Sequence, residues 1–156
     1  MENTSDYSIF LIFLVNLPCA IFMLVLMTGP LVFLAQSRKV KIGQISSTYN
    51  LTIASHLLPP KVFTVILKCA EDNKYKVEDI ETDTFRVILS KPVSFSNFGF
   101  FYPISINQSL QDGQSIIEIG IQSRLIERSV IIRRHHQRLI NLISTALNAY
   151  DSKKTM

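Results

Sequence analysis

The feature that most constrains this chain is an uncharged, strongly apolar run that extends from Ile9 to Ala35. As a helix it would be about 40 Å long, which exceeds the roughly 30 Å hydrocarbon core of a bilayer but is too short for two spans. A buried core helix rarely lacks charge over such a length, and a cleaved signal peptide has a shorter apolar stretch behind a positive N-terminal region. The run therefore predicts a single transmembrane helix over residues 9–35.

The charges that flank this run predict its orientation in the membrane. Glu2 and Asp6 precede it, whereas Arg38, Lys39 and Lys41 follow it. Because Lys and Arg next to a span are retained on the cytoplasmic side, these three cations are the topology-determining candidates. The sequence thus predicts a single-pass protein whose N-terminus lies outside and whose C-terminal domain lies on the cytoplasmic, or organellar interior, side.

The charge of the chain is concentrated after the apolar run. All 16 Lys and Arg residues follow Ala35, whereas two of the 12 acidic residues precede the run, so the remaining part is strongly basic. A basic domain held beside a bilayer favours anionic lipid headgroups or an acidic partner. The two cysteines, Cys19 and Cys69, are too few for a disulfide scaffold or a four-thiolate zinc module, and they indicate a reducing compartment.

Changes in composition divide the chain into five parts. A short N-terminal tail (1–8) precedes the apolar run, and a juxtamembrane linker rich in Ser, Thr and Asn (36–58) follows it. The linker has room for one short structural element. An α+β domain is expected over 59–150, and residues 151–156 form a C-terminal tail.

Hydrophobic periodicity in the domain begins as helical and then alternates. Apolar residues at helical spacing after Pro59-Pro60 predict a helix over 60–72. Alternation then predicts four strands, the last two joined by a hairpin at Asp112-Gly113. The strand residues expected to face the core are Tyr75, Val77, Phe85, Val87, Leu89, Phe98, Phe100, Tyr102, Ile104, Ile106, Ile117, Ile119 and Ile121.

The domain is expected to end in a helix. A continuous apolar stripe from Ile132 to Tyr150 recurs at helical spacing. The predicted fold class is therefore α+β: an N-terminal single transmembrane helix followed by an α-β-β-β-β-α domain. In that domain a four-stranded antiparallel sheet, apolar on one face, grips the C-terminal helix.

Three stretches of the domain resemble a known family. They are Tyr75–Arg86, the Asp112-Gly113 hairpin, and Ile119–Arg124 with the later Ser129 ahead of a basic helix. Over residues 60–148 the chain is similar to a family of small, mostly bacterial α+β domains of unknown function. In that family a helix, two β-hairpins and a closing helix follow one another. The resemblance implies this fold and no particular chemistry.

The side chains that could carry chemistry do not form a recognisable catalytic or metal site. His135 and His136 are adjacent, and neighbouring residues of a helix point about 100° apart, so they cannot share a metal as residues four apart do. The acidic residues from Glu71 to Asp83 fall at a helix end, on a polar strand face and in a turn, where carboxylates are solvated. The common phosphate-binding and nucleophile motifs do not occur. The sequence therefore predicts no enzyme, no cofactor and no metal.

Two groups of side chains are candidate contacts for a partner or a lipid. A basic patch begins the closing helix, and it is either a solvated helix face or a surface for anionic headgroups or an acidic partner. Two aromatic residues lie outside the expected core, and the one at position 101 alternates onto the opposite sheet face, where exposure would mark a contact. These candidates are Arg128, Arg133, Arg134, Arg138, Phe95 and Phe101.

Three functional hypotheses follow. The first is a membrane-anchored interaction domain that assists assembly or stability of a membrane complex. Its partners would be the lipid bilayer and a membrane protein or an anionic lipid surface, with no nucleic acid. The alternative is a lipid- or small-ligand-binding domain of helix-grip type, and the third is an enzyme of unrecognised type. A cavity lined by Phe and Ile would favour ligand binding, whereas a filled core with an exposed Phe101 would favour a partner.

Overall fold

The computed structural model describes residues 40–93, 99–109, 112–125 and 129–154, together with Leu17, Pro18 and Gly29. The chain divides into two compact units, Met1–Ser37 and Arg38–Met156. The second unit contains the strands and helices described below.

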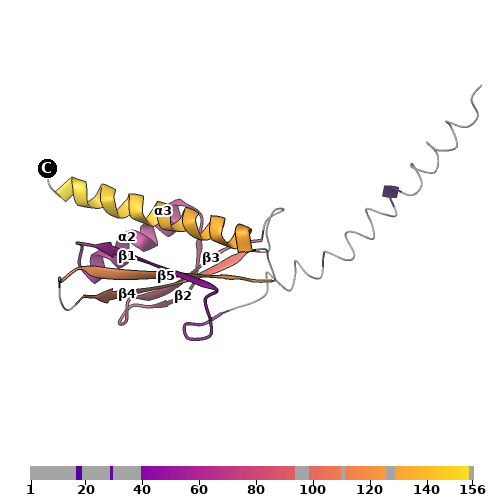
Figure 1. Cartoon of the computed structure of the whole chain (residues 1–156), viewed down its shortest axis with the longest axis horizontal. Helices are drawn as coiled ribbons and strands as arrows, with labels where there is room; N and C mark the ends of the chain where they lie inside the picture. The colour runs from indigo at the N-terminus through magenta and orange to yellow at the C-terminus, as the bar shows by residue number, and fades with distance from the viewer. Residues whose placement is uncertain are drawn as a thin grey trace, which may run out of the picture. The chain divides into compact units, whose positions relative to one another are not determined.

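Five antiparallel strands form one sheet in the order β1-β5-β4-β3-β2, and two helices accompany it in the described part of this unit (Figure 1). Strands β2 to β5 are therefore a meander, and β1 pairs with β5 at one edge. Along the chain the elements are β1 (Tyr49–Ser55), α2 (Pro59–Asp72), β2 (Lys76–Glu81), β3 (Arg86–Lys91), β4 (Phe100–Gln108), β5 (Ser115–Ser123) and α3 (Ser129–Lys154).

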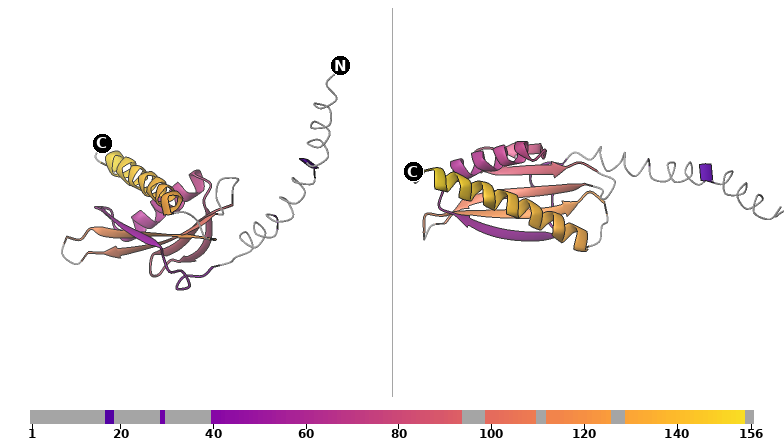
Figure 2. Two further views of the ribbon diagram at one scale, coloured as in Figure 1. Left: turned by 45° about the vertical axis from the view of Figure 1, so that its right-hand side comes forward. Right: turned by 90° about the horizontal axis from the view of Figure 1, so that it is seen from above.

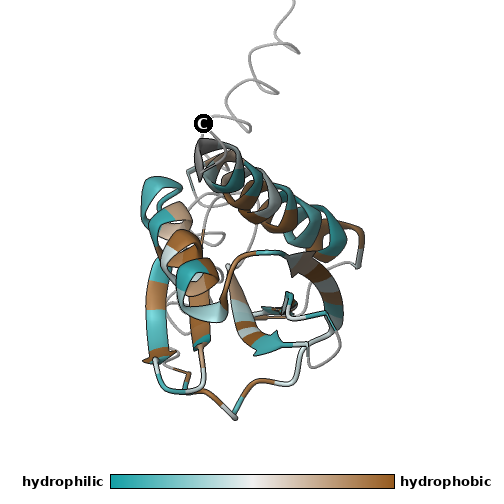
Figure 3. Ribbon diagram, turned by 90° about the vertical axis from the view of Figure 1, so that its left-hand side faces the viewer, coloured by the Kyte–Doolittle hydropathy of each residue, from teal (hydrophilic) through white to brown (hydrophobic). Residues whose placement is uncertain are grey.

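Both helices lie on the same face of the sheet (Figures 2 and 3). The core lies between this face and the helices. Leu89, Tyr102 and Ile119 point into it from three neighbouring strands and are completely buried, and Leu139 and Ile143 of α3 cover them. The alternation predicted for β3, β4 and β5 is confirmed, because one side of each strand fills this core.

The opposite face of the sheet is covered near its middle by the segment that precedes β1. Val40, Ile42 and Ile45 pack over Ile88 and Phe101 and form a second, smaller apolar cluster. The segment is held in place by the Ile42 N–H, which donates to Asp79 Oδ2 at 2.8 Å.

A glycine lets this covering segment approach the sheet. A Cβ added at Gly120 would overlap Ser47 Oγ and would lie 2.9 Å from both Asn50 Oδ1 and Pro103 Cγ. Any side chain at this position would therefore push the segment away from β4 and β5.

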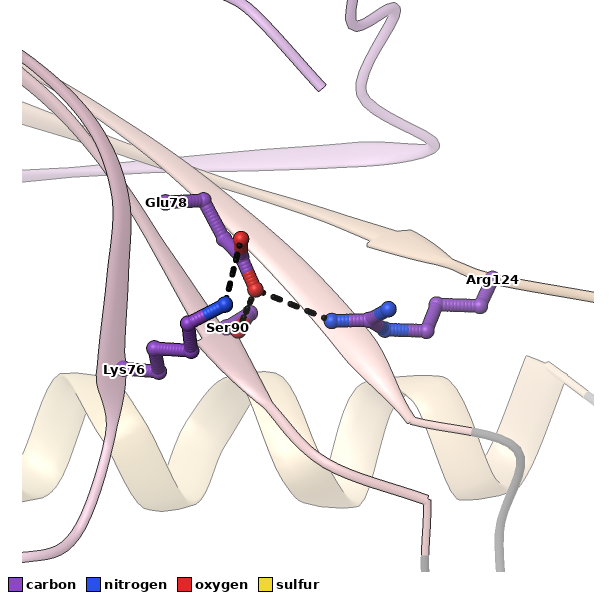
Figure 4. Close-up of polar contacts among 4 residues, drawn as sticks. All are labelled: Lys76, Glu78, Ser90 and Arg124. Atoms are coloured by element: carbon purple, nitrogen blue, oxygen red, sulfur yellow. Dashed lines mark hydrogen bonds and ion pairs between the residues drawn. The ribbon is translucent and has the colours of Figure 1, made fainter. Parts of the chain in front are cut away.

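A polar network of four residues, Lys76, Glu78, Ser90 and Arg124, is centred on the Glu78 carboxylate (Figure 4). The Glu78 carboxylate accepts hydrogen bonds from Ser90 Oγ at 2.6 Å, Lys76 Nζ at 3.1 Å and Arg124 Nη2 at 3.2 Å. The Arg124 guanidinium also lies 4.2 Å from the centre of the Phe101 ring. Burial by itself would raise the pKa of Glu78, but the bonds from Ser90 and Lys76 and the charges of Lys76 and Arg124 outweigh it and lower that pKa.

The sheet has five strands rather than the predicted four, so the predicted fold class is wrong in its strand count. The additional strand, β1, lies inside the predicted linker 36–58 and pairs with β5 along its whole length, from Tyr49 opposite Ile121 to Ser55 opposite Ser115. The alternation of Tyr49, Leu51 and Ile53 was present, but it is short and stands in a stretch rich in Ser, Thr and Asn. The strand that pairs with it also lies far along the chain, so the sequence contained no local sign of the pairing.

The predicted transmembrane helix is also contradicted. No helix among the described residues is both long and apolar enough to cross a membrane, so the described structure gives no support to the predicted single-pass span or to the localisation derived from it. The predicted span 9–35 lies outside the described residues except at Leu17, Pro18 and Gly29.

Candidate functional site

A groove of about 960 Å³ lies between α2 and α3. Both helices contribute to its lining, and they run in opposite directions across the sheet (Figure 2). We call it the α2–α3 groove. Its lining residues are Thr64, Val65, Lys68, Cys69, Asp72 and Asn73 of α2 and the turn after it, and Arg134, Gln137, Arg138, Asn141, Leu142, Thr145, Ala146, Ala149 and Tyr150 of α3.

The space under α3, by contrast, is filled with side chains. Phe100, Tyr102 and Leu139 are at most 1% exposed, and their rings and methyl groups occupy the position where a cavity between sheet and helix would lie. Phe101 on the other face is 0% exposed. On the sequence alone, a cavity lined by Phe and Ile would be evidence for ligand binding, and an exposed Phe101 would be evidence for a partner. Neither feature is present among the described residues.

The floor of the groove is apolar because two helix stripes meet there. Val65 and Cys69 of α2 are buried, and Leu142 and Ala146 of α3 are half-buried against the same core. Residues four apart lie one above the other on a helix, so each pair forms a short apolar row along the groove. Small Ala side chains on α3 leave the space between the rows open.

One end of the groove is positively charged. Arg134 and Arg138 are exposed, stand one turn apart on α3 and line the groove, and Lys68 lines it from α2. Asp72 is the acidic residue that lines this groove. Among the residues that line the groove, three cations therefore outnumber one carboxylate.

Lys91 at the end of β3 extends this positive charge. Its Nζ lies 5.1 Å from the centre of the Tyr75 ring, and burial followed by the charge of Arg138 lowers the Lys91 pKa. Burial raises the pKa of the Tyr75 phenol, and the nearby Arg138 opposes that rise. Because Arg138 affects the pKa of both groups, Lys91, Tyr75 and Arg138 lie close to one another.

Cys69 is the strongest nucleophile among the groove residues. Burial, and then the negative charge of Asp72, raise the pKa of its thiol, and the hydrogen bond from Asn73 only partly opposes them. The thiol is therefore protonated at neutral pH, and a protonated thiol is a poor nucleophile.

The structure separates the basic residues that the sequence grouped into one patch. Arg134 and Arg138 line the α2–α3 groove, whereas the Arg133 guanidinium lies 5.2 Å from the Tyr49 ring, over β1. Lys41 is exposed in the segment before β1. The remaining candidates lie outside the described residues: Arg38, Lys39, Phe95 and Arg128.

Sequence reasoning missed Lys91 as a site residue, although a signal was present. Val87 and Leu89 were predicted to face the core, and the same alternation continued by one step places Lys91 on that face. A lysine that follows two core residues on the same strand face is unusual, because Lys is rarely buried unless another group stabilises its charge. No motif or pattern in the sequence marked the α2 residues of the groove as site residues.

The adjacent histidines have different surroundings. His136 is buried, and its Nε2 donates to the carbonyl oxygen of Ile119 at 2.8 Å, whereas the His135 ring packs against Phe100 with a centroid separation of 4.6 Å. Among the described residues, no group of three or more His, Cys, Asp or Glu side chains is placed to hold a metal ion.

Comparison with known proteins identifies the fold. No family model and no curated protein matches the chain, so the resemblance to the bacterial domain family stays a prediction. Among solved structures, the crystal structure of Ara h 8.0201 matches with a TM-score of 0.52 and 10% identity, over 65% of this chain and 95% of that chain. At this identity the likeness concerns the fold alone: the described domain has a Bet v1-like α+β fold, in which an antiparallel sheet grips a long C-terminal helix.

Proposed function

We propose that the domain binds a small, predominantly apolar ligand in the α2–α3 groove. The observation that carries the proposal is the groove itself, whose volume of about 960 Å³ is at the upper end of the size of small-molecule sites. Such sites commonly lie between helices and combine apolar walls with a few polar groups. The helix-grip arrangement supports the proposal, because it holds α2 and α3 apart on one rigid sheet face.

The apolar floor would supply most of the binding free energy. A ligand that lost about 300 Å² of apolar surface would gain about 7 kcal/mol before the cost of immobilisation, so affinities from micromolar to millimolar are expected. Val65, Leu142 and Ala146 would make these contacts.

We propose binding rather than catalysis. The groove offers the Cys69 thiol as its strongest nucleophile, and the raised pKa of that thiol keeps it protonated. Neither His135 nor His136 is among the groove residues, so no imidazole accompanies the thiol there, and the Asp72 carboxylate raises the pKa of the thiol.

A neutral fluorescent probe tests the proposal. We expect N-phenyl-1-naphthylamine to bind the full-length protein saturably, with a rise in fluorescence, and Thr145→Phe to weaken that binding at least tenfold. Thr145 is exposed and lines the groove, so the phenyl ring would fill the space without entering the core.

The matched control is Asn148→Phe. Asn148 is exposed on the same helix but does not line the groove, and Thr, Asn and Phe have similar helix propensities. Equal loss of binding in the two variants, or no saturable binding to the unmodified protein, would contradict the proposal. The comparison also removes the contribution of probe bound at places that neither side chain lines; Asn148 itself lines a separate, smaller hollow beside β1.

A further inference from the structure

Four nitrogen-bearing side chains gather where β3 ends beside α3. They are Lys91 from the sheet and Arg134, His135 and Arg138 from α3, and we call them the basic cluster. Arg134 and Arg138 belong to the α2–α3 groove, so the cluster stands at one end of it. Lys91 and Arg138 act on each other electrostatically, and Lys91, Arg138 and Arg134 all act on His135.

Buried aromatic rings fix two members of the cluster. The Tyr75 and Phe100 rings each pack against Tyr102, with centroid separations of 5.6 and 6.2 Å. Lys91 is held over the first of these outer rings and His135 against the second. The positions of these two side chains are therefore set by the core.

The positive charge of the cluster is not balanced by a carboxylate. In the part of the chain that the structure describes, no acidic side chain forms an ion pair with Lys91, Arg134 or Arg138, and Asp72 is the carboxylate that shares the groove with them. Burial, and then the charges of Lys91, Arg138 and Arg134, lower the pKa of His135, as expected where cations crowd together. Like charges that act on one another repel, and an anion placed among them would reduce the repulsion.

We infer that Lys91, Arg134 and Arg138 form an anion-binding site at the end of the α2–α3 groove, which receives a carboxylate or phosphate group of the bound ligand. The site rests on the ligand binding proposed above and adds its chemical class: an amphipathic acid, with its apolar part along Val65, Leu142 and Ala146. Two guanidinium groups one turn apart offer several N–H donors to such oxygens, and Lys91 adds a point charge.

The test compares ligands that share one apolar chain and differ in the head group. Decanoate, decyl phosphate, 1-decanol and decyltrimethylammonium are used to displace N-phenyl-1-naphthylamine from the full-length protein at pH 7.5. We expect either or both acids to bind at least tenfold more tightly than 1-decanol, and the trimethylammonium compound to bind most weakly. The comparison of decanoate with decyl phosphate shows which anion the site prefers.

The variant Arg134→Gln/Arg138→Gln separates charge recognition from apolar binding. We expect it to weaken binding of the preferred acid about tenfold and to change 1-decanol binding less than twofold. The control is Arg133→Gln, which removes a charge from the same helix at a position over Tyr49. This control should leave both affinities within twofold, and added salt should reduce the preference for the acid in the unmodified protein.

The NMR titration of His135 provides an independent measurement. An anion seated among the cations should raise the pKa of His135 toward its ordinary value, whereas 1-decanol should not. Equal affinity for the acids and 1-decanol, or equal weakening of both by the double arginine variant, would overturn the anion site and leave ligand binding intact. Failure of the probe and of all four ligands to bind would overturn both proposals.

Discussion

At the scale of single residues, Glu78 forms ion pairs with both Lys76 and Arg124 on the sheet face that is opposite the helices. Its two ion pairs differ in surroundings, because the Lys76 side chain is 72% exposed whereas the Arg124 side chain is 5% exposed. An exposed pair is screened by water, but a buried guanidinium depends on its carboxylate. The same carboxylate therefore makes one weak and one strong interaction.

Replacement of Glu78 by Gln should separate these two interactions. We expect Glu78→Gln to lower the free energy of unfolding by about 2–3 kcal/mol, because it removes the negative charge beside the buried Arg124. Lys76→Gln should change it by less than about 0.5 kcal/mol. Urea unfolding followed by circular dichroism measures both, and similar losses in the two variants would show that Arg124 does not depend on Glu78.

At the scale of elements, α2 shows how much of a helix is specified locally. It begins at Pro59, where a missing N–H costs nothing, as predicted from the Pro59-Pro60 pair. It ends in a Schellman arrangement, in which the Tyr75 N–H donates to the Ala70 carbonyl at 2.8 Å and the Lys74 N–H to the Glu71 carbonyl at 3.0 Å.

The end of α2 contains a strained residue. Lys74 has a φ of 58°, the left-handed conformation that this motif requires and that glycine adopts most easily. We expect Lys74→Gly to raise the free energy of unfolding by about 0.5–1 kcal/mol, and Lys74→Ala, which retains a Cβ, to leave it nearly unchanged. Thermal unfolding compares the two variants. A gain of equal size in both would mean that the side chain of Lys74, rather than its backbone, is unfavourable.

At the scale of the whole molecule, the buried titratable groups make the fold sensitive to acid. Burial lowers the pKa of His136, although its bond to the Ile119 carbonyl opposes this, and the donors around Glu78 lower the pKa of that carboxyl. In both cases the unfolded chain binds protons at a pH at which the folded chain does not. Stability is therefore fully present above the unfolded pKa and is lost as the pH falls toward the folded value.

We expect acid to destabilise the protein in two steps. The first begins below about pH 6.5, where unfolded His titrates, and the second below about pH 4.5, where unfolded Glu titrates; each pKa unit of difference is worth about 1.4 kcal/mol. Urea unfolding at pH 7.5, 5.5 and 3.5 measures both steps. His136→Gln should reduce the first step, to which His135 also contributes, and Glu78→Gln should reduce the second. Stability that stays constant from pH 7.5 to 5.5 would contradict the role assigned to the two histidines.

The sequence by itself determined the features that repeat along the chain. Alternation placed Val87, Leu89 and Tyr102 on one sheet face, and helical spacing defined α2 and the apolar stripe of α3. Such periodicity is readable because an element that buries one face repeats its apolar residues every two or about 3.6 positions.

Only the tertiary structure decided which of these faces meet. Residues 40–45 cover Phe101, β1 joins β5 at the sheet edge, and α2 lies beside α3, so that Arg134 and Arg138 line a groove and Lys91 lies near them. None of these contacts has a period in the sequence, since each joins residues that are far apart along the chain. The candidate site consists of such contacts, and for that reason it became visible only in the folded molecule.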